Sequence, residues 1–251
     1  MASVINVTLS EVGAFSLLLG ETVRETVRRR PEWPVVLDQL HHLGVRSVGI
    51  ATVTALFTGM VLALQTSYSL AAYGAQFFVG DIVSLSLVRE LGPVLTSLMV
   101  GGRVGAGITA EIGTMKVTEQ IDAIRAMAAN PVRKLVVPKV VAIVIMLPIL
   151  VVLADLVGIL GGMFMAISTL NQPGAFYLQH VTTALSLQDI LSGLGKTVFF
   201  ALFIGLIACH NGLNATGGAD GVGRATTQTV VASSLCVLIS DFFLTKFFLA
   251  F

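Results

Sequence analysis

The sequence predicts an all-α integral membrane protein, with five transmembrane helices behind an N-terminal amphipathic helix that lies in the membrane interface. Hydrophobic residues make up 55% of the 251 residues and charged residues 12%, whereas soluble domains are about 25% charged. The stretch from Ser47 to Gly80 contains no Asp, Glu, Lys, Arg or His, and it exceeds the about 20 residues that a helix needs to cross a bilayer. Continuous apolar blocks predict helices, because the strands of membrane barrels alternate instead.

The N-terminal arm, residues 1–34, is predicted to be separate from a five-span domain over residues 35–251. Over residues 8–30, apolar residues recur at spacings of three and four while charged residues fall on other faces. Such a helix is too polar to span a bilayer and suits the membrane surface, although a solvated cytosolic helix would show the same pattern. Pro31 and Pro34 are expected to end it. The apolar stripe consists of Val12, Phe15, Leu19, Val23 and Val27.

Five spans are predicted by hydropathy, in a chain whose mean hydropathy is +0.90. They cover residues 45–70, 82–110, 135–167, 190–210 and 226–249. The intervening segments are a short turn (71–81), a charged segment with its flanks (111–134), a loop containing Gln, Pro and Gly (168–189) and a Gly-rich loop (211–225).

The distribution of Lys and Arg predicts the orientation, since these residues gather on the cytoplasmic side. One side of the predicted spans carries nearly all of them, and on the other side only Lys246 lies near a span end. The N-terminus is therefore predicted to be cytoplasmic and the C-terminus periplasmic. The cytoplasmic cations would be Arg24, Arg28, Arg29, Arg30, Arg46, Arg103, Lys116, Arg125, Arg133, Lys134, Lys139 and Arg224.

The segment EIGTMKVTEQIDAIR, from Glu111 to Arg125, is unusually charged for this chain. It predicts a short cytoplasmic helix over about residues 113–129, ended by Asn130-Pro131. This helix would either rest on the inner leaflet or dock into a groove on a cytosolic partner. Its acids count against lipid as the only partner, because anionic lipid favours Lys and Arg. The apolar stripe is Val117, Ile121, Ile124 and Ala128, and the charged residues are Glu111, Lys116, Glu119, Asp122 and Arg125.

Several charged residues fall inside the predicted spans, where they are costly and a functional role is the default hypothesis. Two interpretations remain open at this point. Ion pairs between these residues would lock the helices together, or the charges would serve a transport path by handling lipid headgroups or holding a partner outside. The residues are Arg89, Glu90, Asp155, Asp189, Lys196, Asp241 and Lys246.

Two kinds of glycine-containing motif occur inside the predicted spans. Gly195-Lys196-Thr197 is not the end of a phosphate-binding loop, because that motif requires glycine where Ile190 stands. The chain is therefore predicted to carry no ATPase of its own. Small residues four apart let helices approach closely in lipid, and the sequence has two such steps, which predict contacts within the chain or between two copies. They are Gly101/Gly105 and Gly158/Gly162.

Two stretches closely resemble the signature of the MlaE (YrbE) permease family. They are RELGPVLTSLMVGGRVGAGITAEIGTMKVTEQIDAI, from Arg89 to Ile124, and GGADGVGRATTQTVV, from Gly217 to Val231. The resemblance implies a homodimeric membrane subunit of an ABC-type lipid transporter that serves MCE-domain proteins. It also implies that the charged cytoplasmic helix is a coupling helix seated on an ATPase subunit. The positions that match the family's lipid cavity are Arg89, Glu90, Asp189, Lys196 and Asp241.

The resemblance thus implies a multi-pass permease of the bacterial inner membrane. It would move phospholipid between that membrane and the periplasmic or outer-membrane side, and so maintain the lipid asymmetry of the outer membrane. We expect no catalytic residue, metal or cofactor in this chain, ATP and Mg bound by the ATPase, a small cytoplasmic STAS-domain subunit, and no nucleic acid. The alternative is an ion-coupled secondary carrier that uses the intramembrane carboxylates, although no inverted repeat supports it. A lipid hydrolase would need a histidine near a Ser or Asp at membrane depth, which the predicted topology lacks.

Overall fold

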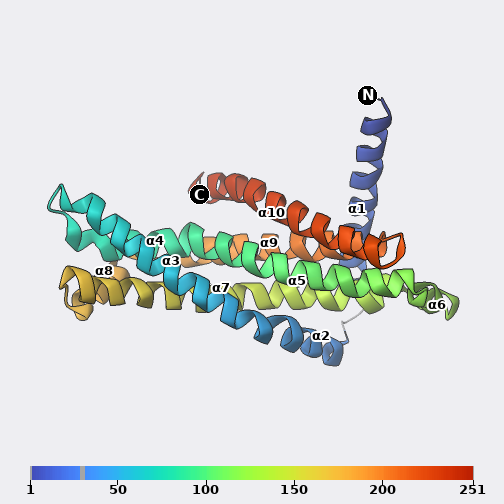
Figure 1. Ribbon diagram of the computed structural model, residues 1–251, viewed down its shortest axis with the longest axis horizontal. Coiled ribbons are helices and arrows are strands. Elements are labelled where there is room, and N and C mark those ends of the chain that lie inside the picture. The colour runs from blue at the N-terminus through green and yellow to red at the C-terminus, as the bar shows by residue number, and fades with distance from the viewer. Residues whose placement is uncertain (1, 29–31, 251) are drawn as a thin grey trace. The chain divides into compact units, whose positions relative to one another are not determined.

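The computed structural model describes residues 2–28 and 32–250. Within this part of the chain every element is a helix or a connecting turn (Figure 1). Five helical stretches are long and apolar enough to cross a membrane, which confirms the predicted number of spans. Their bounds are Trp33–Ala71, Gln76–Val117, Val132–Leu170, Leu187–Leu213 and Gly218–Phe248.

The α-helices carry the labels of Figure 1, and short turns of other helix types join some of them. The α-helices are α1 (Ala2–Arg28), α2 (Trp33–Leu40), α3 (Arg46–Ala71), α4 (Val79–Ser86), α5 (Gly92–Val117), α6 (Gln120–Ala126), α7 (Val137–Leu170), α8 (Gly174–Ala184), α9 (Leu187–Leu213) and α10 (Gly218–Ala250). The π-helical turns are η1 (His41–Val45), η3 (Leu87–Leu91) and η4 (Val132–Val136), and a 3₁₀ turn, η2 (Gln76–Phe78), precedes α4.

The chain folds into two compact units. The first contains the chain up to Val45 together with Gly101–Ile145 and Ala201–Cys236. The second contains Arg46–Val100, Met146–Phe200 and the chain from Val237 onward. Helices α5, α7, α9 and α10 each contribute a segment to both units.

In the first unit, α1 confirms the predicted N-terminal helix. Only part of the predicted apolar stripe packs against the rest of the unit. Leu18 and Thr22 are buried, and Phe15 packs edge-on against His210 with ring centroids 6.1 Å apart. Val23 and Val27 are exposed. Pro31 and the side chain of Val12 lie outside the described residues. Pro34, predicted to end this helix, instead lies in the first turn of α2, where its missing N–H is not needed.

A buried hydroxyl network also stabilises the first unit. Thr109 Oγ1 lies 2.8 Å from Thr229 Oγ1 and 3.0 Å from the Ala208 carbonyl oxygen. Asn211 Nδ2 donates to Thr229 Oγ1 at 2.9 Å. The network therefore joins α5, α9 and α10, and it extends the contact that Gly101 and Gly105 make beside Ile204. That Gly step thus serves packing within the chain.

The predicted coupling helix over residues 113–129 is not one helix. Helix α5 continues to Val117, and α6 begins only at Gln120. Glu119 separates them because it adopts a left-handed backbone conformation with φ of 61°, which is uncommon for residues other than glycine. Ile121 is fully buried, whereas Ala128 is exposed. The predicted apolar stripe is therefore buried at Ile121, in its middle, and exposed at Ala128, its C-terminal end.

The second unit corrects two of the predicted loops. Residues 168–189 contain helix α8, which buries Tyr177 and Val181 against Val79 and Val83 of α4. The predicted turn over residues 71–81 is confined to its first half, because η2 begins at Gln76 and α4 at Val79. Helix α8 and the turn η2 were hidden from hydropathy because they are short and partly polar.

Helices α3 and α7 approach closely in the second unit at a pair of glycines. A Cβ atom added to Gly59 would overlap the backbone of Gly158. Gly162 lies on the same stripe and faces Tyr177 and Val83. The Gly158/Gly162 step thus packs within the chain, as small residues four apart allow.

This contact predicts opposite effects for two alanine substitutions on α3. Gly59→Ala should lower the free energy of unfolding by about 1–3 kcal/mol, because the added methyl group forces the backbones apart. Gly49→Ala is the matched control, since nothing lies within 4 Å of a Cβ atom there, and it should stabilise the helix by up to about 1 kcal/mol. Thermal unfolding of both variants in detergent measures the difference. Equal shifts would contradict the close packing.

Candidate functional site

A break in regular helix geometry begins the site. Pro93 lacks the N–H that would normally bond to the carbonyl of Arg89, four residues earlier. The chain makes the π-helical turn η3 directly before it, in which the Gly92 N–H donates to the Leu87 carbonyl. Turns of this kind are frequent at functional sites. The turn carries Arg89 and Glu90 and leaves the Arg89 carbonyl oxygen for a side chain to bond.

The first half of the site joins η3 to the start of α9. Arg89 Nε donates to Asp189 Oδ1 at 2.6 Å. Asp189 Oδ2 accepts from the Ser186 N–H at 2.8 Å and from Ser186 Oγ at 2.7 Å, while the Asp189 N–H donates back to Ser186 Oγ. This reciprocal pattern is a capping box with aspartate in place of glutamate. The Ser-x-x-Asp sequence therefore holds the carboxylate of Asp189 in the orientation that receives Arg89.

The second half joins η3 to α10 through Lys196, whose side chain is only 2% exposed. Lys196 Nζ donates to Thr245 Oγ1 at 2.6 Å, to Glu90 Oε2 at 2.7 Å and to the Arg89 carbonyl at 3.1 Å. Asp241 Oδ1 lies 3.3 Å from the same nitrogen. Lys196 thus bonds to the carbonyl from which Pro93 removes the usual helical donor, and it forms ion pairs with two carboxylates.

Close approach of α9 to η3 depends on a glycine. A Cβ atom at Gly193 would overlap the carbonyl of Val88. Glycine at this position lets the backbone of α9 lie against the π-helical turn. Lys196 and Asp189 are then within reach of η3 from the same helix.

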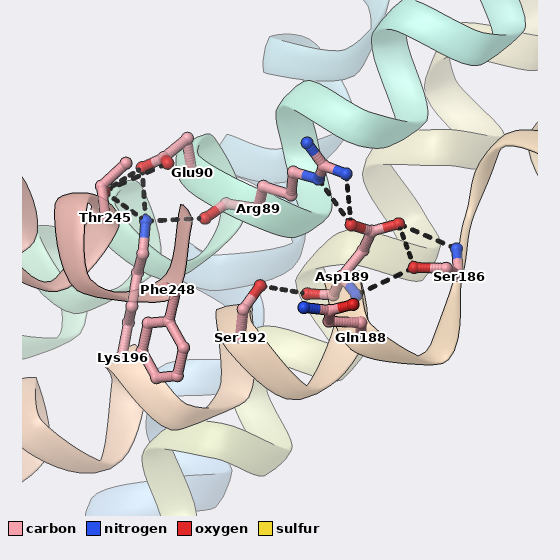
Figure 2. Close-up of a pocket in the computed structure, with 9 residues that line it drawn as sticks. All are labelled: Arg89, Glu90, Ser186, Gln188, Asp189, Ser192, Lys196, Thr245 and Phe248. Carbon is pink, nitrogen blue, oxygen red and sulfur yellow. Dashed lines mark hydrogen bonds and ion pairs between the residues drawn. The ribbon is translucent and has the colours of Figure 1, made fainter. Parts of the chain in front are cut away.

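These groups line a cavity of about 320 Å³ (Figure 2). The Arg89 guanidinium reaches toward Asp189 (Figure 2), and 45% of the Arg89 side chain is exposed. Glu90 is 39% exposed, whereas Asp189 is buried. With all groups ionised, the two bases Arg89 and Lys196 face three acids, Glu90, Asp189 and Asp241, which is a net charge of −1. The lining consists of Arg89, Glu90, Ser186, Gln188, Asp189, Ser192, Lys196, Thr245 and Phe248.

The structure brings together the five intramembrane residues predicted for the lipid path and separates two others. Asp155 lies against Gly92 behind η3, and Lys246 is exposed outside the cluster. The sequence did not point to Ser186, Gln188, Ser192, Thr245 and Phe248. Two of these had a readable signal, because Ser186 begins a capping box and Thr245 lies one helical turn after Asp241.

The predicted coupling residues behave differently from one another. Asp122 bonds to Lys116 Nζ at 3.2 Å and to Arg125 Nη1 at 3.2 Å, so one exposed cluster spans the break between α5 and α6. Glu119 is exposed at the break itself. Glu111 instead points into the first unit, where its Oε2 accepts from the buried Lys139 at 2.6 Å.

Lys139 also donates to Gln39 Oε1 at 3.1 Å, so α2, α5 and α7 meet at this cation. The sequence presented Lys139 only as one of the cytoplasmic cations. Its burial could not be read there, because Gln39 and Glu111 are distant in sequence and reach it only through packing.

Comparison with known proteins decides the family. A model of the family described as permease MlaE matches residues 36–247. The chain belongs to the MlaE permease family. A probable ABC transporter permease of Rickettsia conorii is 41% identical over 237 residues, which cover 94% of this chain and 92% of the relative. One from Synechocystis is 42% identical over 233 residues, covering 93% and 88%. The intermembrane phospholipid transport system permease protein MlaE of Haemophilus influenzae is 42% identical over 217 residues, covering 86% and 83%.

Membership of the MlaE family and the five apolar helices make this chain a multi-pass membrane protein and a permease subunit of an ABC transporter. The matched region contains the exposed cluster around Asp122 and all of the pocket lining except Phe248. Chemically, the pocket is suited to binding rather than to covalent reaction. Its serine hydroxyls already donate hydrogen bonds, Ser192 to the Asp189 carbonyl and Ser186 to the Asp189 carboxylate.

Proposed function

We propose that this permease moves phospholipid, and that the charged pocket handles the lipid headgroup. The observation that carries the proposal is Arg89, which lines the pocket with 45% of its side chain exposed. Two of its nitrogens, Nε and Nη2, bond to Asp189. The remaining N–H groups of the guanidinium are free in geometry to bind phosphate oxygens, for which its planar fork is well suited.

The rest of the pocket supports this role. Ser192 and Gln188 supply polar atoms beside Arg89, and Phe248 supplies an apolar wall. Such a mixture suits the junction between a phosphate and its glycerol and acyl chains. Lys196 is enclosed, so it orients Glu90 and the backbone of η3 rather than facing the lipid. The family relationship adds weight, because the Haemophilus relative is named for intermembrane phospholipid transport.

The proposed mechanism places the energy source outside this chain. Two copies of the permease form a homodimer in the bacterial inner membrane, with the N-terminus in the cytoplasm and the C-terminus in the periplasm. A separate ABC ATPase binds ATP and Mg and docks at the exposed cluster of Lys116, Glu119, Asp122 and Arg125. An MCE-domain protein on the periplasmic side and a small cytoplasmic STAS-domain subunit complete the complex. The physiological role is maintenance of outer-membrane lipid asymmetry.

Arg89→Gln tests the headgroup role. We expect phospholipid transfer by the reconstituted complex to fall at least about tenfold, because a fork of charged donors is replaced by a single neutral amide. Arg89→Lys should be intermediate, since it keeps the charge and loses the fork. The matched control is Arg224→Gln, which removes another exposed arginine that is bonded to a carboxylate, that of Asp220. Phospholipid bound per permease, counted by mass spectrometry, is the second readout.

The same assay separates the proposal from a secondary carrier. Transfer should require ATP and the ATPase subunit, and it should persist when the proton gradient is dissipated. Transfer driven by a proton gradient without ATP would overturn the proposal. Normal lipid loading and transfer by Arg89→Gln would leave the ABC mechanism standing but remove the pocket from it.

A further inference from the structure

A second polar contact between ionisable side chains lies in the same unit, apart from the pocket. His180 of α8 places Nδ1 3.0 Å from Asp81 Oδ1 and 3.1 Å from Oδ2, so it addresses both oxygens of this α4 carboxylate. Both side chains are largely buried, with 23% and 22% exposed. Phe176 and Phe78 flank the imidazole, with ring centroids 4.6 and 6.2 Å away. The two rings pack against the imidazole and help to fix its orientation.

The pair sits at the tightest part of the contact between α4 and α8. A Cβ atom at Gly80 would lie 3.0 Å from the Tyr177 carbonyl oxygen and 3.2 Å from His180 Cβ. Tyr177 and Val181 are buried on the same face of α8. Helix α8 has only 11 residues, which is too short to be stable alone. Its position therefore depends on these contacts with α4.

Both helices lead directly into the charged pocket. Helix α4 ends at Ser86, and η3 with Arg89 and Glu90 follows immediately. Helix α8 ends at Ala184, and Ser186, which orients Asp189, follows after one extended residue. A shift of α8 along α4 would therefore move Ser186 and Asp189 relative to Arg89.

We propose that Asp81 and His180 form a latch that fixes α8 on α4 and thereby positions the Arg89–Asp189 side of the pocket. The effect of the latch on lipid transfer rests on the proposed function, whereas its effect on the stability of α8 does not. Its two residues are positioning residues, since neither lines the pocket.

Among the described residues around His180, the charged side chain that faces it is Asp81. Its other neighbours are Phe78 of η2 and Phe176 of its own helix, while α7 meets α8 through Gly162 and Tyr177. The contact with Asp81 is therefore a specific polar contact that holds this face of α8 on α4.

Hydrogen exchange of residues 174–184 in the whole complex measures the latch directly. His180→Gln and Asp81→Asn should each lower the protection of the α8 amides about tenfold relative to the wild type, which corresponds to ~1.4 kcal/mol. The exchanged pair Asp81→His with His180→Asp should restore the protection. Lys134→Gln, which breaks the exposed pair with Glu32, is the matched control and should leave the protection unchanged.

Lipid transfer then tests the positioning. His180→Gln should lower transfer several-fold, and the exchanged pair should recover it. Unchanged protection in the single variants would overturn the latch. Lost protection with normal transfer, in a complex where Arg89→Gln is impaired, would overturn the positioning role and leave the proposed function intact. Normal transfer by Arg89→Gln as well would count against the proposed function instead.

Discussion

Replacing Lys196 with methionine should destabilise the permease by about 3–5 kcal/mol and abolish most phospholipid transfer. Lys196 is enclosed and bonds to Glu90, Thr245 and the Arg89 carbonyl. Its removal leaves Asp241, whose side chain is only 21% exposed, and the more exposed Glu90 without a cation. An uncompensated charge that is largely buried, such as that of Asp241, is strongly destabilising. Thermal unfolding and ATP-driven transfer by the reconstituted complex measure the two effects.

A compensated variant separates a structural role of Lys196 from a role in the lipid path. In Lys196→Met combined with Glu90→Gln and Asp241→Asn, no unpaired charge remains, and the free energy of unfolding should return to near its original value. We expect transfer to recover with it, because the exposed guanidinium of Arg89 is unchanged. A stable triple variant without transfer would show that Lys196 or its carboxylates contact the lipid themselves.

The five spans were predictable because each is a continuous apolar block, and hydropathy alone decides where such a block lies. Helix α8 was not predictable in this way. Its Tyr177 and Val181 are apolar contacts only because α4 supplies Val79 and Val83 opposite them. The break between α5 and α6 was also hidden, since nothing in the local sequence requires Glu119 to adopt a positive φ.

In the pocket, too, some features could be predicted from the sequence and others depend on packing. Charged residues inside spans are expensive, so the sequence marked seven of them. The family resemblance selected five, namely Arg89, Glu90, Asp189, Lys196 and Asp241. It did not show that Lys196 serves both Glu90 and Asp241, because the pairing depends on how each helix is rotated. The π-helical turn η3 sets that rotation. Its cause, Pro93, is visible in the sequence, but its consequence for the Arg89 carbonyl appears only when α9 packs beside it.

Asp122→Lys should reduce copurification of the ATPase subunit at least about tenfold, a loss of ~1.4 kcal/mol or more in binding. Asp122 is half-exposed and bonds to both Lys116 and Arg125. The substitution removes the shared carboxylate and places a third cation between them, so the cluster repels instead of holding α6 beside the end of α5. Like charges in an interface cost several kcal/mol. Glu119→Lys, at the exposed break, should act in the same direction.

The control for Asp122→Lys is Glu32→Lys, which reverses another exposed carboxylate of the same unit that is paired with a lysine, Lys134. It should leave copurification unchanged. Asp122→Asn should be intermediate, because it removes the attraction without adding repulsion. Membrane insertion and lipid loading of the permease alone should be the same for all three variants, since the charged pocket belongs to the other unit. Full copurification of the ATPase with Asp122→Lys would place the motor elsewhere on the chain, and the exposed cluster would then serve the inner leaflet only.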